Sequence, residues 1–382
     1  MAIALLATGL NREPRTSWTG LEKAVAEVEA GRKTTPLVRG SAAGGEAAVT
    51  FLARRVGRRV PRIISDVTGW GERVDGTFDF NVGTMTRVGH TEWYSLNTKV
   101  VARARIEYLI AYGLTDYRLD PHNPRTSVRT AFGANPASEF VTPGYATPEE
   151  FAEGPILPAG IVSETSFAAR ALGKDCRIGV YTPSQYRDDG AFPVAVFLDR
   201  RSQPVSRVLD WLIARREIQP VLAVFVECDS RGGDYATGLP LQTFVTEELV
   251  HWLASHYAVT SDSSERAILG ISFRAKDALD AVFSRGKAFG KAGLLIPGRR
   301  LTPGDVDVLV RQRHTGVQVA ILAGLYDRAN LPTARQVRQA LTNGGHAVQY
   351  FEVAEGHNPV TCFYNLRQIL VSLFGVGRQG HP

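Results

Sequence analysis

The feature that most constrains the fold is an alternation of short apolar runs and helix-length amphipathic stretches between residues 160 and 377. Short, continuously apolar runs are typical of strands that are buried on both faces of a sheet. The runs are Ile178–Tyr181, Val194–Leu198, Val221–Val226, Ala267–Leu269, Ala292–Ile296, Val317–Leu322 and Val348–Val353. The stretches between and after them are Ser206–Arg215, Thr243–His256, Ala275–Phe283, Ala334–Thr342 and Tyr364–Leu373. This order predicts a three-layer α/β domain with a mostly parallel sheet.

The first part of the chain has a different texture. Apolar residues at helical spacing predict one short helix within 20–31. Residues 46–145 then carry alternating or β-branched runs separated by Gly- and Asp-bearing turns, which predicts a β-sandwich of about 100 residues. These runs are Ala47–Ala53, Arg62–Val67, Phe78–Val88, Glu92–Leu96 and Ala102–Ala111. A Pro-, Gly- and acid-rich stretch at 143–158 predicts a linker, so we expect domains at 1–155 and 156–382.

Composition excludes several classes of protein. Of the 382 residues, 44% are hydrophobic and 21% are charged, as in an ordinary globular protein and unlike a disordered chain. No apolar run reaches the roughly 18 residues that span a bilayer, and no basic stretch precedes Ala2–Leu10, so we expect neither a membrane segment nor a secretory signal. The formal net charge of +6 favours anionic partners. Because stacking aromatics do not alternate with basic residues, we do not expect nucleic-acid binding.

The cysteines and histidines give no metal signature. Cys176, Cys228 and Cys362 form no CxxC pair, so neither a zinc site nor a disulfide framework is expected. The eight histidines show no ligand spacing, so we expect no catalytic metal and no cofactor. Unpaired cysteines fit a reducing, cytoplasmic compartment best.

The strongest chemical signal is the segment Gly270–Arg274, which follows a predicted strand and precedes a predicted helix. This is the context of a nucleophile elbow, G-x-S-x-G, in which a tight turn exposes a serine hydroxyl. Gly270 fits the pattern on one side of Ser272, and Arg274 departs from it on the other. The alternative is that Ser272 only caps the helix.

Two downstream residues complete the chain order of an α/β-hydrolase triad, in which an acid and then a histidine follow the serine. Asp327 follows the predicted strand 317–322, and His357 lies on a glycine-containing loop after the last strand. The histidine would remove the proton of the serine hydroxyl, and the acid would hold the histidine in one tautomer. Glu355 is a rival acid, whereas His346 precedes the last strand and is expected in a turn.

Backbone N–H groups of Phe273 and of Arg200, in the loop after 194–198, are the expected oxyanion donors. Several arginines fall in loops at the expected carboxyl edge of the sheet, where open α/β sheets bind ligands. We therefore expect a small, anionic ester substrate to contact arginines there. The arginines are Arg274, Arg201, Arg231 and Arg299, with Arg300 nearby.

The chain resembles the enterochelin (enterobactin) esterase family, which is related to the esterase D group. The resemblance extends over some 350 residues and comprises several short motifs in a fixed order. The motifs are Gly31–Val38, Val49–Arg54, Val67–Gly71, Trp93–Tyr94, Tyr108–Pro124, Cys176–Pro183, Glu247–Leu249 and Ser264–Arg266 before the elbow. The resemblance implies an immunoglobulin-like N-terminal domain on an α/β-hydrolase. It also implies hydrolysis of tri-catecholate siderophore esters by Ser272, His357 and Asp327.

The sequence departs from the family pattern at three places. The family has Gly where Arg200 and Arg274 stand, and it often has a tryptophan soon after the histidine, where Phe363 and Tyr364 are the nearest aromatics. Arginine at these positions either obstructs the oxyanion pocket or binds an anionic group. Two other functions therefore stay open: an acyltransferase or cyclising enzyme, and a ligand-binding protein with impaired catalysis. The sequence does not determine the oligomeric state.

Overall fold

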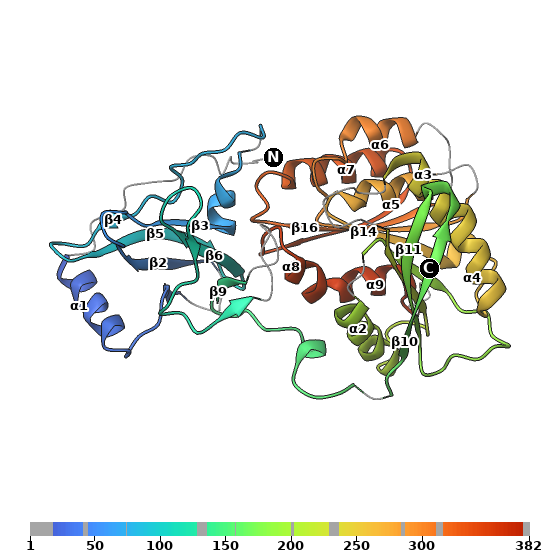
Figure 1. Ribbon diagram of the computed structural model, residues 1–382, viewed down its shortest axis with the longest axis horizontal. Coiled ribbons are helices and arrows are strands. Elements are labelled where there is room, and N and C mark those ends of the chain that lie inside the picture. The colour runs from blue at the N-terminus through green and yellow to red at the C-terminus, as the bar shows by residue number, and fades with distance from the viewer. Residues whose placement is uncertain are drawn as a thin grey trace. The chain divides into compact units, whose positions relative to one another are not determined.

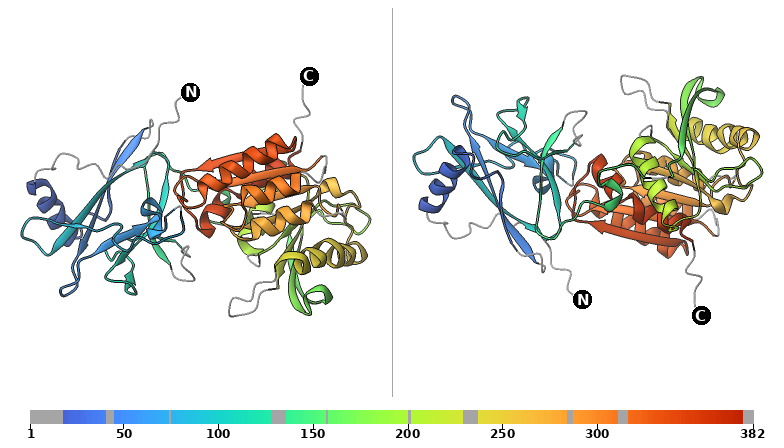
Figure 2. Two further views of the ribbon diagram at one scale, coloured as in Figure 1. Left: turned by 90° about the horizontal axis from the view of Figure 1, so that it is seen from above. Right: turned by 90° about the horizontal axis from the view of Figure 1, so that it is seen from below.

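The chain folds into two units, one with antiparallel sheets and one with a mostly parallel sheet (Figures 1 and 2). The first unit runs to Ala146 and also contains Ala354–Asn358, and the second contains Thr147–Val353 and the chain from Pro359 onward. The computed structural model describes residues 18–40, 45–73, 75–127, 136–156, 158–199, 202–228, 237–283, 287–310 and 316–376.

The first unit is built from two antiparallel sheets. One has the order β1-β2-β5-β4, and the other has the order β3-β6-β9-β8 with β7 beside β6. The elements are α1 (Trp18–Glu29), β1 (Leu37–Arg39), β2 (Glu46–Arg54), β3 (Arg62–Ser65), the 3-10 helix η1 (Asp66–Gly71), β4 (Thr86–Arg87), β5 (Trp93–Val101), β6 (Arg105–Ala111), β7 (Tyr117–Arg118), β8 (Thr126–Ser127) and β9 (Ala137–Val141).

Aromatic side chains join the two sheets. Phe51 on β2 lies 5.0 Å from the Tyr108 ring on β6 and 5.6 Å from the Phe140 ring on β9, measured between centroids. The predicted helix is present as α1, and its buried face packs against Leu52, Val88 and Trp93. A two-sheet β unit is therefore present, while its immunoglobulin-like character stays a prediction.

One strand prediction in this unit was wrong. Residues 78–85 form turns and two isolated β-bridges, Phe78 with Glu72 and Thr84 with Arg62, and only Thr86–Arg87 of the expected run is a strand. Gly83 has φ of +71° and lies so close to the Ile63 backbone that a Cβ would come 1.7 Å from the Ile63 carbonyl oxygen. A residue in this left-handed conformation turns the chain out of the sheet.

The second unit contains one eight-stranded sheet with the order β10-β11-β13-β12-β14-β15-β16-β17. The six strands from β13 to β17 in this order are parallel, and β10 and β11 are antiparallel at one edge. The strands are β10 (Ile161–Ala169), β11 (Lys174–Thr182), β12 (Val194–Phe197), β13 (Leu222–Glu227), β14 (Arg266–Ile271), β15 (Lys291–Leu295), β16 (Gln318–Gly324) and β17 (Ala347–Val353). The expected mostly parallel sheet is confirmed.

Helices cover both faces of this sheet, as Figure 1 shows. The core on one face contains side chains of the helices from α3 to α7, and the core on the other face contains side chains of α2, α8 and α9. The helices are η2 (Glu149–Phe151), η3 (Arg170–Leu172), α2 (Ser202–Ala214), α3 (Gly238–Thr243), the π-helix η4 (Phe244–Leu249), α4 (Val250–His256), η5 (Ser263–Glu265), α5 (Arg274–Val282), α6 (Pro303–Val310), α7 (Leu331–Asn343), α8 (Pro359–Tyr364) and α9 (Leu366–Phe374). The predicted three-layer α/β architecture is therefore correct.

The cysteines correct another expectation. Cys176 and Cys228 form a disulfide, with 4.4 Å between their Cα atoms. Arg177 on β11 pairs with Glu227 on β13, so the two cysteines are the next residues along this antiparallel pair. They are 52 residues apart in sequence, and only the pairing of the strands brings them together. The expected reducing compartment thereby loses its support. Within the described ranges, no helix is long and apolar enough to cross a membrane.

Candidate active site

Ser272 occupies a sharp turn between β14 and α5. Its φ of +54° lies in the left-handed region, which a non-glycine residue adopts only when its surroundings impose it. The Ser272 N–H donates to the Leu295 carbonyl at 2.9 Å, and its carbonyl accepts from Ala275 and Gly298 at 3.1 Å each. The N-cap position of α5 is Phe273, not Ser272, so helix capping does not account for the serine. This strained conformation is the one that a nucleophile elbow requires.

Two glycines make room for this turn. A Cβ at Gly270 would lie 2.1 Å from the Arg274 carbonyl oxygen, so only glycine fits there. A Cβ at Gly298 would lie 3.1 Å from Ser272 Oγ and 3.3 Å from the Phe273 nitrogen. The sequence pattern identified Gly270 but not Gly298, because Gly298 follows β15 and reaches the serine only through the parallel pairing of β14 with β15.

Arg274, which stands where the pattern has glycine, is buried at the start of α5. Its guanidinium forms an ion pair with Asp277 at 3.3 Å and lies 5.0 Å from the Phe273 ring centroid. Asp277 also pairs with Arg300 at 3.1 Å, and Arg300 donates to the Phe273 carbonyl at 3.3 Å. The turn thus accommodates an arginine because a buried carboxylate meets its charge. The expected contact between Arg274 and substrate stays a prediction.

Asp327 lies three residues past the end of β16 and is buried. Its N–H donates to the Gly324 carbonyl at 3.1 Å, and Asn330 Nδ2 donates to its Oδ1 at 2.7 Å. The carboxylate is therefore fixed on the loop before α7. This loop leaves the sheet at the same edge as the Ser272 turn, because β14, β15 and β16 are parallel.

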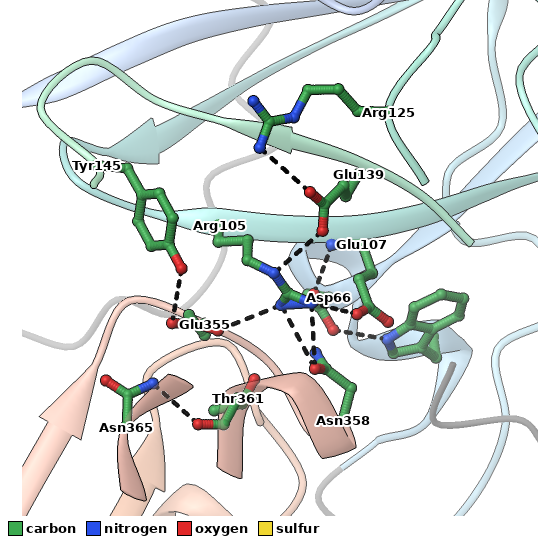
Figure 3. Close-up of polar contacts among 11 residues, drawn as sticks. Asp66, Arg105, Glu107, Arg125, Glu139, Tyr145, Glu355, Asn358, Thr361 and Asn365 are labelled. Carbon is green, nitrogen blue, oxygen red and sulfur yellow. Dashed lines mark hydrogen bonds and ion pairs between the residues drawn. The ribbon is translucent and has the colours of Figure 1, made fainter. Parts of the chain in front are cut away.

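His357 lies on the loop Ala354–Asn358 after β17 and is half-buried. The carboxylate of Glu355, the rival acid, accepts from Arg105 at 3.2 Å and from the Tyr145 hydroxyl at 3.4 Å (Figure 3). Those contacts give Glu355 a role in holding the loop, which favours Asp327 over Glu355 as the proposed acid.

The loop after β12 is only partly described. Leu198 donates its N–H to the Leu269 carbonyl at 2.9 Å, which fixes the start of this loop beside β14. Arg200, the expected second oxyanion donor, and Arg201 and Arg231 lie outside the described residues. Arg299 is described and exposed, on the segment that follows Gly298.

A very small, mostly apolar pocket adjoins the strand that leads into Ser272. It is lined by Phe197, Asp199, Val205, Ile271, Leu295, Cys362, Phe363 and Leu366. Within the described ranges, no group of three or more His, Cys, Asp or Glu side chains could hold a metal ion.

Comparison with known proteins agrees with this geometry. Residues 169–298 match the sequence family described as putative esterase. No curated protein matches the chain. Ferric enterobactin esterase from Salmonella typhimurium is similar in structure, with a TM-score of 0.69 and 19% identity, over 89% of this chain and 96% of that one.

Two further structures are similar. One is the enterobactin esterase of Shigella flexneri in the presence of enterobactin, with a TM-score of 0.66 and 17% identity, over 89% of this chain and 96% of that one. The other is a ferulic acid esterase from Anaeromyces mucronatus, with a TM-score of 0.51 and 14% identity, over 60% of this chain and 96% of that one. At these identities the structures show a shared fold. The family match over residues 169–298, on this shared fold, supports a carboxylic ester hydrolase.

Proposed function

We propose that this ester hydrolase works through an acyl-serine intermediate, with Ser272 as the nucleophile, His357 as the general base and Asp327 as the orienting acid. The observation that carries the proposal is the positive φ of Ser272 between a parallel strand and a helix. A serine without a catalytic role would not require this strained conformation, whereas in a nucleophile the conformation exposes the hydroxyl to substrate.

The chemistry proceeds in two halves. Ser272 Oγ attacks the ester carbonyl while His357 takes the hydroxyl proton, and the proton then passes to the departing alkoxide as the C–O bond breaks. Water attacks the acyl-serine in the second half, with His357 again accepting a proton and returning it to Ser272 Oγ. The products are a carboxylic acid and an alcohol. Asp327 keeps the imidazole in the tautomer that accepts the proton.

Backbone donors would stabilise the negative charge on the carbonyl oxygen. We assign one to the Phe273 N–H, at the first position after the serine, and the other to the Arg200 N–H. Gly298 leaves open the space beside Ser272 Oγ and the Phe273 nitrogen. An acyl carbonyl approaching the serine needs this space.

For the substrate we propose an anionic catecholate ester of the siderophore type. Support comes from the similarity to the enterobactin esterases over 89% of this chain and from the net charge of +6. Arg201, Arg231 and Arg299 are the proposed contacts to the catecholates. Arg274, which also forms an ion pair with Asp277, is the fourth proposed contact.

The test is chromatographic analysis of enterobactin, and separately of methyl ferulate, after incubation with wild type and with Ser272→Ala. We expect wild type to release 2,3-dihydroxybenzoyl-serine faster than it releases ferulate, and the variant to release neither. Ferulate released faster than the catecholate would overturn the substrate class. Turnover by Ser272→Ala at the wild-type rate would overturn the mechanism.

A further inference from the structure

The loop that carries His357 belongs to the first unit, although it continues directly from a strand of the second. Ala354–Asn358 packs with residues of the N-terminal sheets, whereas Val353 before it and Pro359 after it belong to the second unit. The Arg105 N–H, at the first residue of β6, donates to the Ala354 carbonyl at 3.1 Å. The main chain of the loop is therefore hydrogen-bonded to the first residue of β6.

The Arg105 side chain adds a second attachment, shown in Figure 3. Its guanidinium is fully buried and donates from Nη1 to Glu355 at 3.2 Å and from both Nη atoms to Asn358 Oδ1 at 3.4 Å. The same group donates to Glu107 and, at 3.1 Å, to Glu139 on the neighbouring strand β9. Arginine presents donors in a rigid fork, so one side chain ties both ends of the loop to the sheet.

The middle of the loop rests against Asp66. A Cβ at Gly356 would come 1.8 Å from Asp66 Oδ1, so only glycine at this position allows the loop to lie this close to the carboxylate. Asp66 is itself fixed, because it accepts from Trp70 Nε1 at 2.9 Å and from the Glu107 N–H at 2.7 Å. Residues on both sides of His357 are thus held by the first unit.

The charges make this attachment depend on Arg105. The guanidinium forms ion pairs with Glu107, Glu139 and Glu355, and its charge also acts on Asp66. Of these four carboxyl groups, those of Asp66, Glu107 and Glu355 are fully or almost fully buried. Burial raises the pKa of Asp66 to about 6 and that of Glu107 to about 8. Removing the arginine would leave the buried carboxyl groups without this cation, and the loop would lose the hydrogen bonds that Arg105 donates to Glu355 and Asn358.

We propose that Arg105 is a positioning residue for His357, so that the N-terminal unit fixes the conformation of the loop bearing the general base. This inference rests on the serine mechanism proposed above. The attachment of this loop bears on the chemical step, because a displacement of a catalytic group by about 1 Å can cost about a hundredfold in rate.

The test compares variants that remove the attachment in steps. Arg105→Gln removes the charge and most of the fork, Arg105→Lys keeps the charge, and Asn358→Ala removes only one acceptor. Arg118→Gln is the matched control, because Arg118 on β7 of the same unit also forms a two-pronged pair, with Asp116, and is exposed. Each variant is measured for kcat, KM, thermal unfolding and the rate of labelling by a fluorophosphonate.

We expect Arg105→Gln to lower kcat and the labelling rate by about a hundredfold, with KM changed less than about threefold. Arg105→Lys should recover part of the loss, and Asn358→Ala should cost about tenfold in kcat at an unchanged unfolding temperature. Arg118→Gln should match wild type in kcat. If Arg105→Gln does not fold, Asn358→Ala and Arg105→Lys carry the test.

Wild-type kcat in folded Arg105→Gln, or in both milder variants, would overturn the inference. A loss of kcat that equals the unfolded fraction of each variant would also overturn it, because that is the signature of a merely structural role. Failure of the mechanism is distinguished by Ser272→Ala. If that variant stays active, the serine mechanism fails, and if it is inactive while the Arg105 variants are fully active, only the positioning role fails.

Discussion

Replacing Glu107 with glutamine should make the stability of the protein less dependent on pH above pH 6. Burial raises the pKa of the Glu107 carboxyl to about 8, from 4.5 in an exposed glutamate. Between these values the folded protein keeps a proton that the unfolded chain has lost. The contribution of this group to the unfolding free energy is therefore complete below about pH 4.5 and is lost as the pH rises through 8.

The size of the effect follows from one proton. The unfolding free energy changes by about 1.4 kcal/mol per pH unit for each proton that only the folded state holds. For a folded pKa of about 8, wild type should lose about 2 kcal/mol between pH 6 and pH 7.5 through Glu107. Glutamine cannot titrate, so Glu107→Gln should not lose this amount. Asp66, whose pKa is about 6, is half-titrated at the start of this range, and it titrates in both wild type and the variant.

The assay is urea unfolding followed by tryptophan fluorescence at four pH values from 6 to 7.5, for wild type and Glu107→Gln. The difference between their unfolding free energies should grow by about 2 kcal/mol over this range. Glu352→Gln is the control. The hydrogen bond from Arg335 lowers the pKa of Glu352, so that group titrates below this range in both states. A difference that stays constant within about 0.5 kcal/mol for Glu107→Gln would refute the reasoning.

Three further predictions concern the elbow and the disulfide. Gly270→Ala should abolish esterase activity and destabilise the fold by about 1–3 kcal/mol, because the added Cβ would overlap backbone atoms of the turn. Gly304→Ala is the control, because a Cβ at Gly304 meets no atom closer than 3.8 Å, and it should leave kcat and the unfolding temperature at or above those of wild type. Gly298→Ala should lower kcat by about tenfold or more, because its Cβ would stand 3.1 Å from Ser272 Oγ, and an unchanged kcat would contradict the role given to that space. Thiol titration of the unfolded chain should find Cys362 alone before reduction and three thiols afterwards, and reduction should lower the unfolding free energy by up to about 4 kcal/mol, as expected for a cross-link between residues 52 apart.

The hydrolase sheet was predictable because its strands are buried on both faces. A strand such as Val194–Phe197 must be apolar throughout, so it stands out from its surroundings in the sequence. The edge strand β10 was missed because most of its side chains are exposed, and its polar residues interrupt the apolar run. In the first unit, residues 78–85 contain apolar side chains but pair through isolated bridges at Phe78 and Thr84 rather than along a strand, and the sequence pattern therefore suggested a strand where there is none.

The candidate site divides along similar lines. Ser272, Asp327 and His357 each follow a strand of the parallel sheet, so their positions could be read from the order of strands and loops. Gly298 could not be identified, because its role depends on how two neighbouring strands end. Arg105 was equally hidden, since the residues it joins are up to 253 positions away in the sequence. A buried charge has no periodicity, and its meaning depends on partners that only the fold brings together.

The disulfide could not be predicted from the sequence either. Spacing rules for cysteines describe local motifs, and Cys176 and Cys228 meet only because β11 pairs with β13. The arginine at the elbow is a comparable case. The sequence indicated a conflict at Arg274, and in the structure the charge of this buried arginine is met by Asp277 on the next turn of α5.

The most direct measurement of the central claim is the intact mass of the protein after exposure to a fluorophosphonate. Wild type, Ser272→Ala and His357→Ala would be treated under the same conditions, and the labelled peptide would be identified after digestion. We predict one adduct on wild type, located on Ser272, and no adduct on Ser272→Ala. Labelling of His357→Ala should be much slower than that of wild type. An unlabelled wild type, or an adduct that persists in Ser272→Ala, would contradict it.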